Sequence, residues 1–97
     1  GRFGGIKVKL NGIRILENAL RENNGADVMV YISHSLYGDQ KIKTKLDYIY
    51  NEEHVGLCIG EQRIYINKGK ITNYGVKDGI YFADDVMKID IKLNRAV

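Results

Sequence analysis

Lysine recurs at every second position in the middle of the chain, at Lys41, Lys43 and Lys45. Alternate residues of an extended strand point to the same side, so these side chains would form a ladder of cations. Such a ladder can bind the phosphates of single-stranded RNA, with some of the seven tyrosines as platforms on which bases stack. The same pattern is typical of a solvent-exposed strand face, or of an edge strand whose lysines prevent pairing with another edge. Tyr48 and Tyr50 fall on the opposite side of the strand, which favours this second interpretation.

The single cysteine, Cys58, stands four residues after His54 in an apolar stretch. Four residues along a strand cover about 13 Å at roughly 3.3 Å per residue, which is too far for a hydrogen-bonded nucleophile and base. Because Cys58 lies between Leu57 and Ile59, we predict that it is a small buried apolar side chain. A metal site needs three or four convergent ligands, and the two histidines and the cysteine are too scattered to predict one.

Acidic residues occur in adjacent pairs at Glu52-Glu53 and Asp84-Asp85. Neither pair has the spacing of a calcium-binding loop, and acidic pairs in turns are usually solvated. The chain contains neither a P-loop nor the glycine fingerprint of a dinucleotide-binding turn. We therefore expect no catalytic residues, no metal ligands and no cofactor, and we predict that the protein is not an enzyme.

The composition is that of a single folded domain. The chain has 97 residues, of which 44% are hydrophobic and 28% are charged, and its net charge is +3. This length predicts one domain over residues 1–97, with a flexible start at residues 1–5. One cysteine excludes an internal disulfide framework and fits a reducing compartment, so we expect a cytoplasmic protein. The longest apolar run, Val28–Ile32, is too short to cross a bilayer, and we expect no membrane partner.

The elements that would position these residues begin with a strand, Ile6–Leu10, in which apolar and basic residues alternate. Asn11 is a candidate N-cap for a helix of about three turns, whose apolar stripe lies within residues 13–20. Glu17 and Arg21 are expected to pair on the polar side of this helix. The Asn-Asn-Gly that follows ends the helix, because glycine readily adopts the left-handed conformation of a helix C-terminus.

Short strands separated by turns are expected in the rest of the chain. Asp27–Ser33 is apolar on both sides and is a candidate central strand, whereas Lys41–Tyr50 alternates most regularly. In the last strand, Val86–Leu93, the odd-numbered apolar residues are expected to point inward and the charged residues outward. We predict an α+β fold, in which a small, strongly bent antiparallel sheet or barrel of five to seven strands carries one N-terminal helix packed on it.

Two short motifs carry a resemblance to a known family. Asp47 and Asn51 are separated by three residues, and residues 64–71 combine an apolar run with a lysine and a glycine. Over about half of the chain these motifs are similar to those of the Sm-like RNA-binding barrels, the second with one extra residue. Members of that family assemble into rings by pairing edge strands. The resemblance implies that Asp47, Asn51 and Lys68 border an RNA pocket in which Tyr50 stacks on a base.

Two functions from different classes follow from these patterns. The first is a small non-catalytic binding module that acts through protein–protein interaction or self-association, at an exposed strand edge or a tyrosine-bearing surface. Its expected partner is another protein or a second copy of the chain. The alternative is an Sm-like or other small-barrel RNA-binding protein. Its nucleic-acid-binding residues would be Lys41, Lys43, Lys45, Asp47, Tyr50, Asn51 and Lys68.

Overall fold

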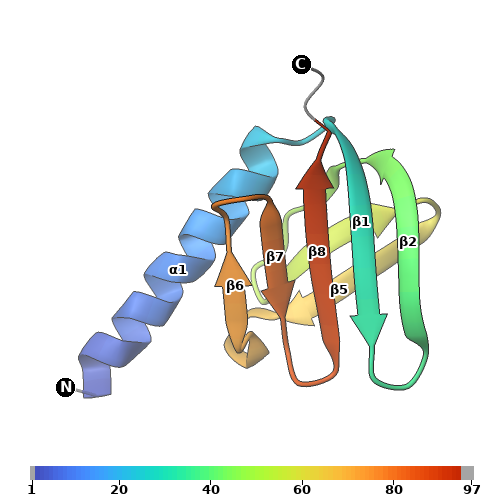
Figure 1. Cartoon of the computed structure of the whole chain (residues 1–97). Coiled ribbons are helices and arrows are strands. Elements are labelled where there is room, and N and C mark those ends of the chain that lie inside the picture. Colours follow the sequence, from blue (N-terminus) through green and yellow to red (C-terminus); the bar gives the residue numbers. More distant parts are fainter. Residues whose placement is uncertain (1, 95–97) are drawn as a thin grey trace.

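The computed structural model describes the backbone of residues 2–94 and the side chains of residues 12–94. One long helix comes first and strands follow it along the chain (Figure 1). The elements are α1 (Arg2–Glu22), β1 (Asp27–His34), β2 (Gly38–Lys45), β3 (Asp47–Ile49), β4 (His54–Ile59), β5 (Gln62–Asn67), the 3-10 turn η1 (Lys68–Lys70), β6 (Asn73–Gly75), β7 (Ile80–Ala83) and β8 (Met87–Leu93).

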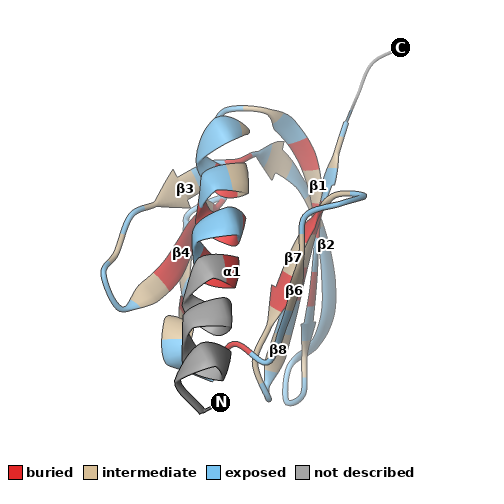
Figure 2. Ribbon diagram, turned by 90° about the vertical axis from the view of Figure 1, so that its left-hand side faces the viewer, coloured by how far each residue is buried: buried red, intermediate tan, exposed pale blue. Residues whose placement is uncertain are grey.

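The strands form two antiparallel sheets that face each other. Five strands form one sheet in the order β2-β1-β8-β7-β6, and three form the other in the order β3-β4-β5. Helix α1 contacts β6 and β7 and closes one side of the layer between the sheets (Figure 2). The predicted α+β class is confirmed. The described residues contain eight strands in two sheets, where one bent sheet or barrel of five to seven strands was expected.

Helix α1 is longer than predicted. The predicted strand Ile6–Leu10 is wrong, because these residues continue α1, and Asn11 lies inside the helix instead of at its start. Alternation over five residues does not distinguish a strand from a helix, and a nucleated helix extends by one hydrogen bond for each added residue. Residues 2–5, expected as a flexible start, also belong to α1, whereas residue 1 lies outside the described residues.

A glycine inside α1 allows the helix to approach the five-stranded sheet. A side chain at Gly12 would collide with the ring of Tyr74 in β6. Glycine in a helix interior costs about 1 kcal/mol relative to alanine. The close contact between α1 and β6 therefore explains why a weak helix former occupies this position.

The predicted strand Lys41–Tyr50 is two strands in the structure, β2 and β3, which belong to different sheets. Leu46 separates them and is only 3% exposed. Its N–H donates to the carbonyl of Ala26 over 2.8 Å, and its carbonyl accepts from the N–H of Gly25 over 2.7 Å. The chain thus crosses from one sheet to the other at Leu46, beside the loop that joins α1 to β1. The alternation of residues 41–50 continues through this point, so the sequence pattern does not reveal the crossing.

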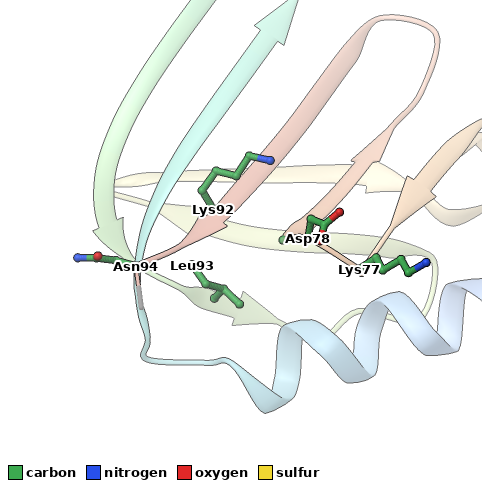
Figure 3. Close-up of a pocket in the computed structure, with 6 residues that line it drawn as sticks. Lys77, Asp78, Lys92, Leu93 and Asn94 are labelled. Atoms are coloured by element: carbon green, nitrogen blue, oxygen red, sulfur yellow. The ribbon is translucent and has the colours of Figure 1, made fainter. Parts of the chain in front are cut away.

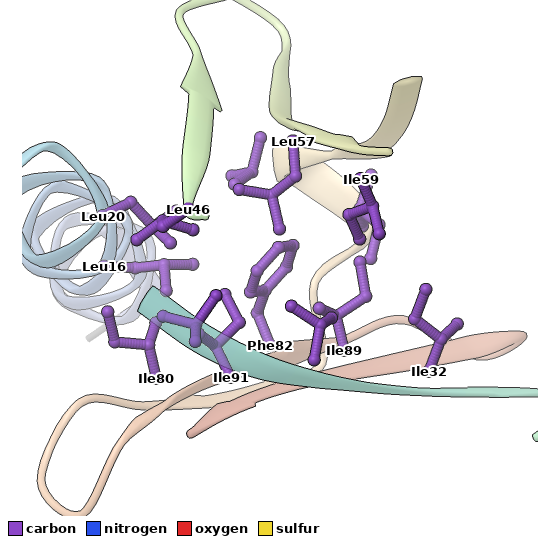
Figure 4. Packing of buried hydrophobic residues seen from close by; sticks show 14 of the residues in the cluster. Leu16, Leu20, Ile32, Leu46, Leu57, Ile59, Ile80, Phe82, Ile89 and Ile91 are labelled. Atoms are coloured by element: carbon purple, nitrogen blue, oxygen red, sulfur yellow. The ribbon is translucent and has the colours of Figure 1, made fainter. Parts of the chain in front are cut away.

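The hydrophobic core lies between the two sheets and against α1. Phe82, in the middle of β7, is fully buried and points across the layer toward Leu57 of β4 (Figure 4). Leu16 and Leu20 of α1 fill the adjoining side of the layer. In β8, Ile89 and Ile91 are fully buried, and Met87 and Leu93 pack at the border of the same cluster, as the alternation predicted.

Removing the central ring of the core tests this packing. We expect Phe82→Ala to lower the free energy of unfolding by about 3–5 kcal/mol, because the lost apolar contacts leave a cavity between two sheets. Chemical denaturation measures the change. Tyr37→Ala is the control, since Tyr37 is 78% exposed, and it should shift the free energy of unfolding by less than about 0.5 kcal/mol. Equal effects of the two substitutions would contradict the position given to Phe82.

Candidate binding surface

The lysine ladder lies on β2, at one edge of the five-stranded sheet. Lys41, Lys43 and Lys45 are all exposed, whereas Ile42 and Thr44, which alternate with them, are half-buried on the core side. Among the described strands only β1 pairs with β2, so the other edge of β2 is open. In Figure 1 this edge lies on the side of the sheet away from α1.

Among the described residues, one of the three ladder lysines has an acidic group within ion-pair distance. Lys45 Nζ lies 3.0 Å from Asp27 Oδ1, at a position where both side chains are largely exposed. Within the part of the chain that the structure describes, Lys41 and Lys43 form no ion pair. Their positive charge is available to a binding partner.

Tyrosines from other strands lie on the same side of the sheet as these lysines. Lys41 of β2, Tyr31 of β1, Asp90 of β8 and Tyr81 of β7 occupy directly opposite positions on successive strands. Lys41 Nζ lies 5.7 Å from the ring centroid of Tyr31, and Lys88 Nζ lies 5.2 Å from that of Tyr81. We call this surface the tyrosine–lysine face. Its residues are Tyr31, Lys41, Lys43, Tyr81, Lys88, Asp90 and Lys92.

Tyr81 lies close over the sheet because its neighbour on β6 has no side chain. Gly75 is opposite Tyr81, and a Cβ at Gly75 would collide with the tyrosine ring. The sequence itself contains a signal for the position of both tyrosines. Tyr31 and Tyr81 each stand between two apolar residues that are buried in the structure. Because successive side chains of a strand point to opposite faces, both tyrosines point outward.

The residues of the Sm-like motifs lie apart from the tyrosine–lysine face. Asp47 belongs to the three-stranded sheet, where it is opposite Cys58. Asn51 stabilises the turn before β4, because its Oδ1 accepts from the backbone N–H groups of Glu53 and His54 at 2.9 and 3.0 Å. The structure brings two residues of the set together, since Lys68 Nζ lies 5.8 Å from the ring centroid of Tyr50.

Lys68 also takes part in a polar cluster that joins α1 to the three-stranded sheet. Its Nζ lies 3.2 Å from Glu17 Oε2, and the Tyr48 hydroxyl donates to the same oxygen over 2.6 Å. Glu17 is only 9% exposed, so the predicted pair with Arg21 on the polar side of the helix is wrong. Position 17 falls on the apolar stripe, four residues after Ile13, and this spacing was the overlooked signal.

Burial, and after it the hydrogen bond to Glu17, together raise the pKa of Tyr48 from the ordinary 10.0 to about 12. Both effects disfavour the phenolate, which would lose its hydration and stand beside a carboxylate. The polar groups of this cluster are satisfied, because no buried side-chain nitrogen or oxygen among the described residues lacks a hydrogen-bond partner. The cluster is therefore a structural link, and it leaves Lys68 committed to Glu17.

Cys58 is not buried as predicted. It is partly exposed, while Leu57 and Ile59 on either side are buried, so alternation along β4 turns the thiol outward. Its Sγ lies 3.4 Å from the carbonyl oxygen of Gly60. Among the described residues, no group of three or more histidine, cysteine or acidic side chains is arranged to hold a metal ion.

A pocket of about 440 Å³ lies where the turn before β7 meets the end of β8 (Figure 3). Lys92 comes from β8, and Lys77 and Asp78 come from the turn. Lys92 Nζ also lies 3.6 Å from Asp90 Oδ1 on the tyrosine–lysine face. The polar side chains of the lining are two lysines, an aspartate and an asparagine. Its residues are Lys77, Asp78, Gly79, Lys92, Leu93 and Asn94.

The raised pKa of Tyr48 predicts a loss of stability in strong alkali. Below the unfolded pKa of about 10, Tyr48 is protonated in both states, and its contribution to folding is fully present. That contribution is lost as the pH rises through the folded pKa of about 12. Absorbance at 295 nm measures tyrosine ionisation, and the difference between wild type and Tyr48→Phe should have its midpoint near pH 12. A midpoint near pH 10 would contradict the buried hydrogen bond to Glu17.

The described residues give no helix with the length and apolar character that a membrane crossing requires. The chain was compared with known protein families, curated proteins and solved structures, and none of them matches it.

Proposed function

We propose that this chain is a non-catalytic binding domain that recognises a protein partner through the tyrosine–lysine face. The observation that carries the proposal is the position of Tyr31 and Tyr81, each beneath a lysine on the outer side of a sheet whose inner side forms the core. Tyrosine combines a large apolar ring with a polar tip and is enriched in protein interfaces. It also loses little conformational entropy when it is ordered by a partner.

The charges on β2 favour a different protein over a second copy at this edge. A two-fold antiparallel pairing of β2 with its own copy can place Lys43 opposite Lys43 and Lys41 opposite Lys45. Like charges in directly opposite positions destabilise a strand pair. In that register self-association through β2 is disfavoured, and the proposal commits to a protein of another sequence.

We further propose that the protein is cytoplasmic, and the cysteine supports both this location and the absence of catalysis. Cys58 is a free thiol, and its contact is a backbone carbonyl, which cannot act as a general base toward it. One free cysteine also fits a reducing compartment such as the cytoplasm. A partner in that compartment is expected.

Affinity capture tests the protein-binding proposal. Wild type, Tyr31→Ala/Lys41→Glu and the control Tyr37→Ala/Lys70→Glu would be incubated with a ribonuclease-treated lysate of the source organism. We expect proteins that are retained by wild type and control and lost from the Tyr31 variant. With the purified partner, loss of a central tyrosine should raise Kd about thirtyfold, the effect of roughly 2 kcal/mol at an interface hot spot. An identical set of proteins on all three baits would refute the proposal.

A second candidate function is binding of single-stranded RNA by the same face. Tyr31 and Tyr81 stand two strands apart, roughly 9.5 Å at the usual strand spacing, and could each stack on a base beside the lysines. Asp90 between them repels phosphate, which is why we place this function second. The residues of the Sm-like motifs would not share in such a site, because Asp47 lies in the three-stranded sheet and Asn51 and Lys68 lie in segments next to its strands.

Fluorescence anisotropy with a labelled, mixed-sequence single-stranded RNA tests this second function. Binding should weaken with salt, and Lys41→Glu/Lys43→Glu should reduce the slope of log Kd against log salt by about 1.4, at ~0.7 for each lost phosphate contact. Arg63→Glu/Lys70→Glu carries the same charge change away from the face and should retain the wild-type slope. No binding at low salt would exclude the RNA function.

A further inference from the structure

The open edge of β2 is long and regular. Its eight residues pair with β1 in one continuous register, from Asp27 opposite Lys45 to His34 opposite Gly38, without a bulge. An edge strand directs alternate N–H and C=O groups away from its neighbour, where they can pair with another chain. The backbone of β2 therefore offers a template for one more strand.

We propose that this edge accepts an extended segment of the protein partner as a sixth strand, and that the segment carries carboxylates at alternate positions. The proposal rests on the proposed function and adds the chemistry of the partner. Directly opposite residues of paired strands have Cβ atoms about 4.5–5.5 Å apart, within the reach of a lysine and a carboxylate. Lys41 and Lys43 are the two ladder lysines without an ion pair in the described chain, so each can receive one carboxylate.

The core side of β2 specifies the residue between the two carboxylates. Ile42 is half-buried and packs at the border of the hydrophobic core. The residue opposite it on an added strand would face the same layer, where an apolar or β-branched side chain is favoured. The recognised segment is therefore acidic, apolar and acidic at three consecutive positions.

The existing contacts of the ladder set the position of the added strand. Lys45 is already paired with Asp27, so a third carboxylate opposite it would compete with that aspartate. Lys41 Nζ lies over the ring of Tyr31, which joins the edge to the tyrosine–lysine face. A partner strand centred opposite Ile42 would thus meet the tyrosine–lysine face through Lys41, with Tyr31 one strand further on.

Synthetic peptides test this inference directly. The probe is a fluorescein-labelled eight-residue peptide in which glutamate alternates with valine, and its control has the same composition with the glutamates contiguous. We expect wild type and Arg63→Glu/Lys70→Glu to bind the alternating peptide about tenfold more tightly than the contiguous one. Lys41→Glu/Lys43→Glu should lose this preference and instead bind a peptide with lysine in place of glutamate. Equal affinity of wild type for the alternating and contiguous peptides would overturn the inference.

Hydrogen exchange distinguishes an added strand from charge attraction alone. On binding of the alternating peptide, the amides of β2 that face the open edge should become protected, and N-methylation of the peptide backbone should abolish binding. Peptide binding with unchanged exchange in β2 would overturn strand addition. Binding of single-stranded RNA without binding of either peptide would also overturn it, in favour of the nucleic-acid function.

The lysines could instead act only to prevent edge pairing. In that case Lys41→Thr/Lys43→Thr would self-associate in light scattering and neither peptide would bind wild type, which would refute the inference. Failure of the peptides while affinity capture still depends on Tyr31 would remove the acidic strand and leave the proposed function standing. If the peptides fail to bind and affinity capture does not depend on Tyr31, both the acidic strand and the proposed function are refuted.

Discussion

Two backbone hydrogen bonds at Leu46 fix the point at which the chain passes from the five-stranded sheet to the three-stranded sheet. Through them, the loop between α1 and β1 holds the chain at the point where it leaves one sheet for the other. Because β2 ends there, its lysines stay at an outer edge of the five-stranded sheet. Asp47 and the residues after it enter the three-stranded sheet and face a different environment. This crossing therefore separates the ladder lysines from the residues of the Sm-like motifs.

The cluster of Glu17, Tyr48 and Lys68 depends on the same crossing. Tyr48 follows Leu46 by two residues, and its backbone N–H donates to Asn24 Oδ1 over 2.8 Å, which fixes the start of β3 beside the end of α1. The Tyr48 ring can then reach Glu17 on the buried side of the helix. A buried carboxylate is tolerated when it is paired and hydrogen-bonded, and here Lys68 and Tyr48 supply both interactions.

Local patterns predicted the C-terminal strand well, because its two faces differ in polarity along its whole length. In β8, Ile89 and Ile91 alternate with charged residues, and the two sets occupy opposite sides of the sheet. The same rule failed at Ile6–Leu10, where alternation is too short to exclude a helix, and at Leu46, where hydrogen bonds to residues 25 and 26 break the strand. The second failure involves partners about twenty residues away in sequence, and the gathering of Tyr31 and Tyr81 on one face likewise joins distant segments.

Protection of an edge strand and selection of a partner can come from the same charges. Many edge strands are blunted by short length, proline or a bulge, and each of these also prevents pairing with a partner. β2 has eight residues, no proline and an uninterrupted register with β1, so charge is the protective feature that its sequence shows. Charge excludes only strands of like sign. An edge protected in this way stays open to a strand of opposite sign, and the spacing of the lysines decides which residues of that strand must be acidic.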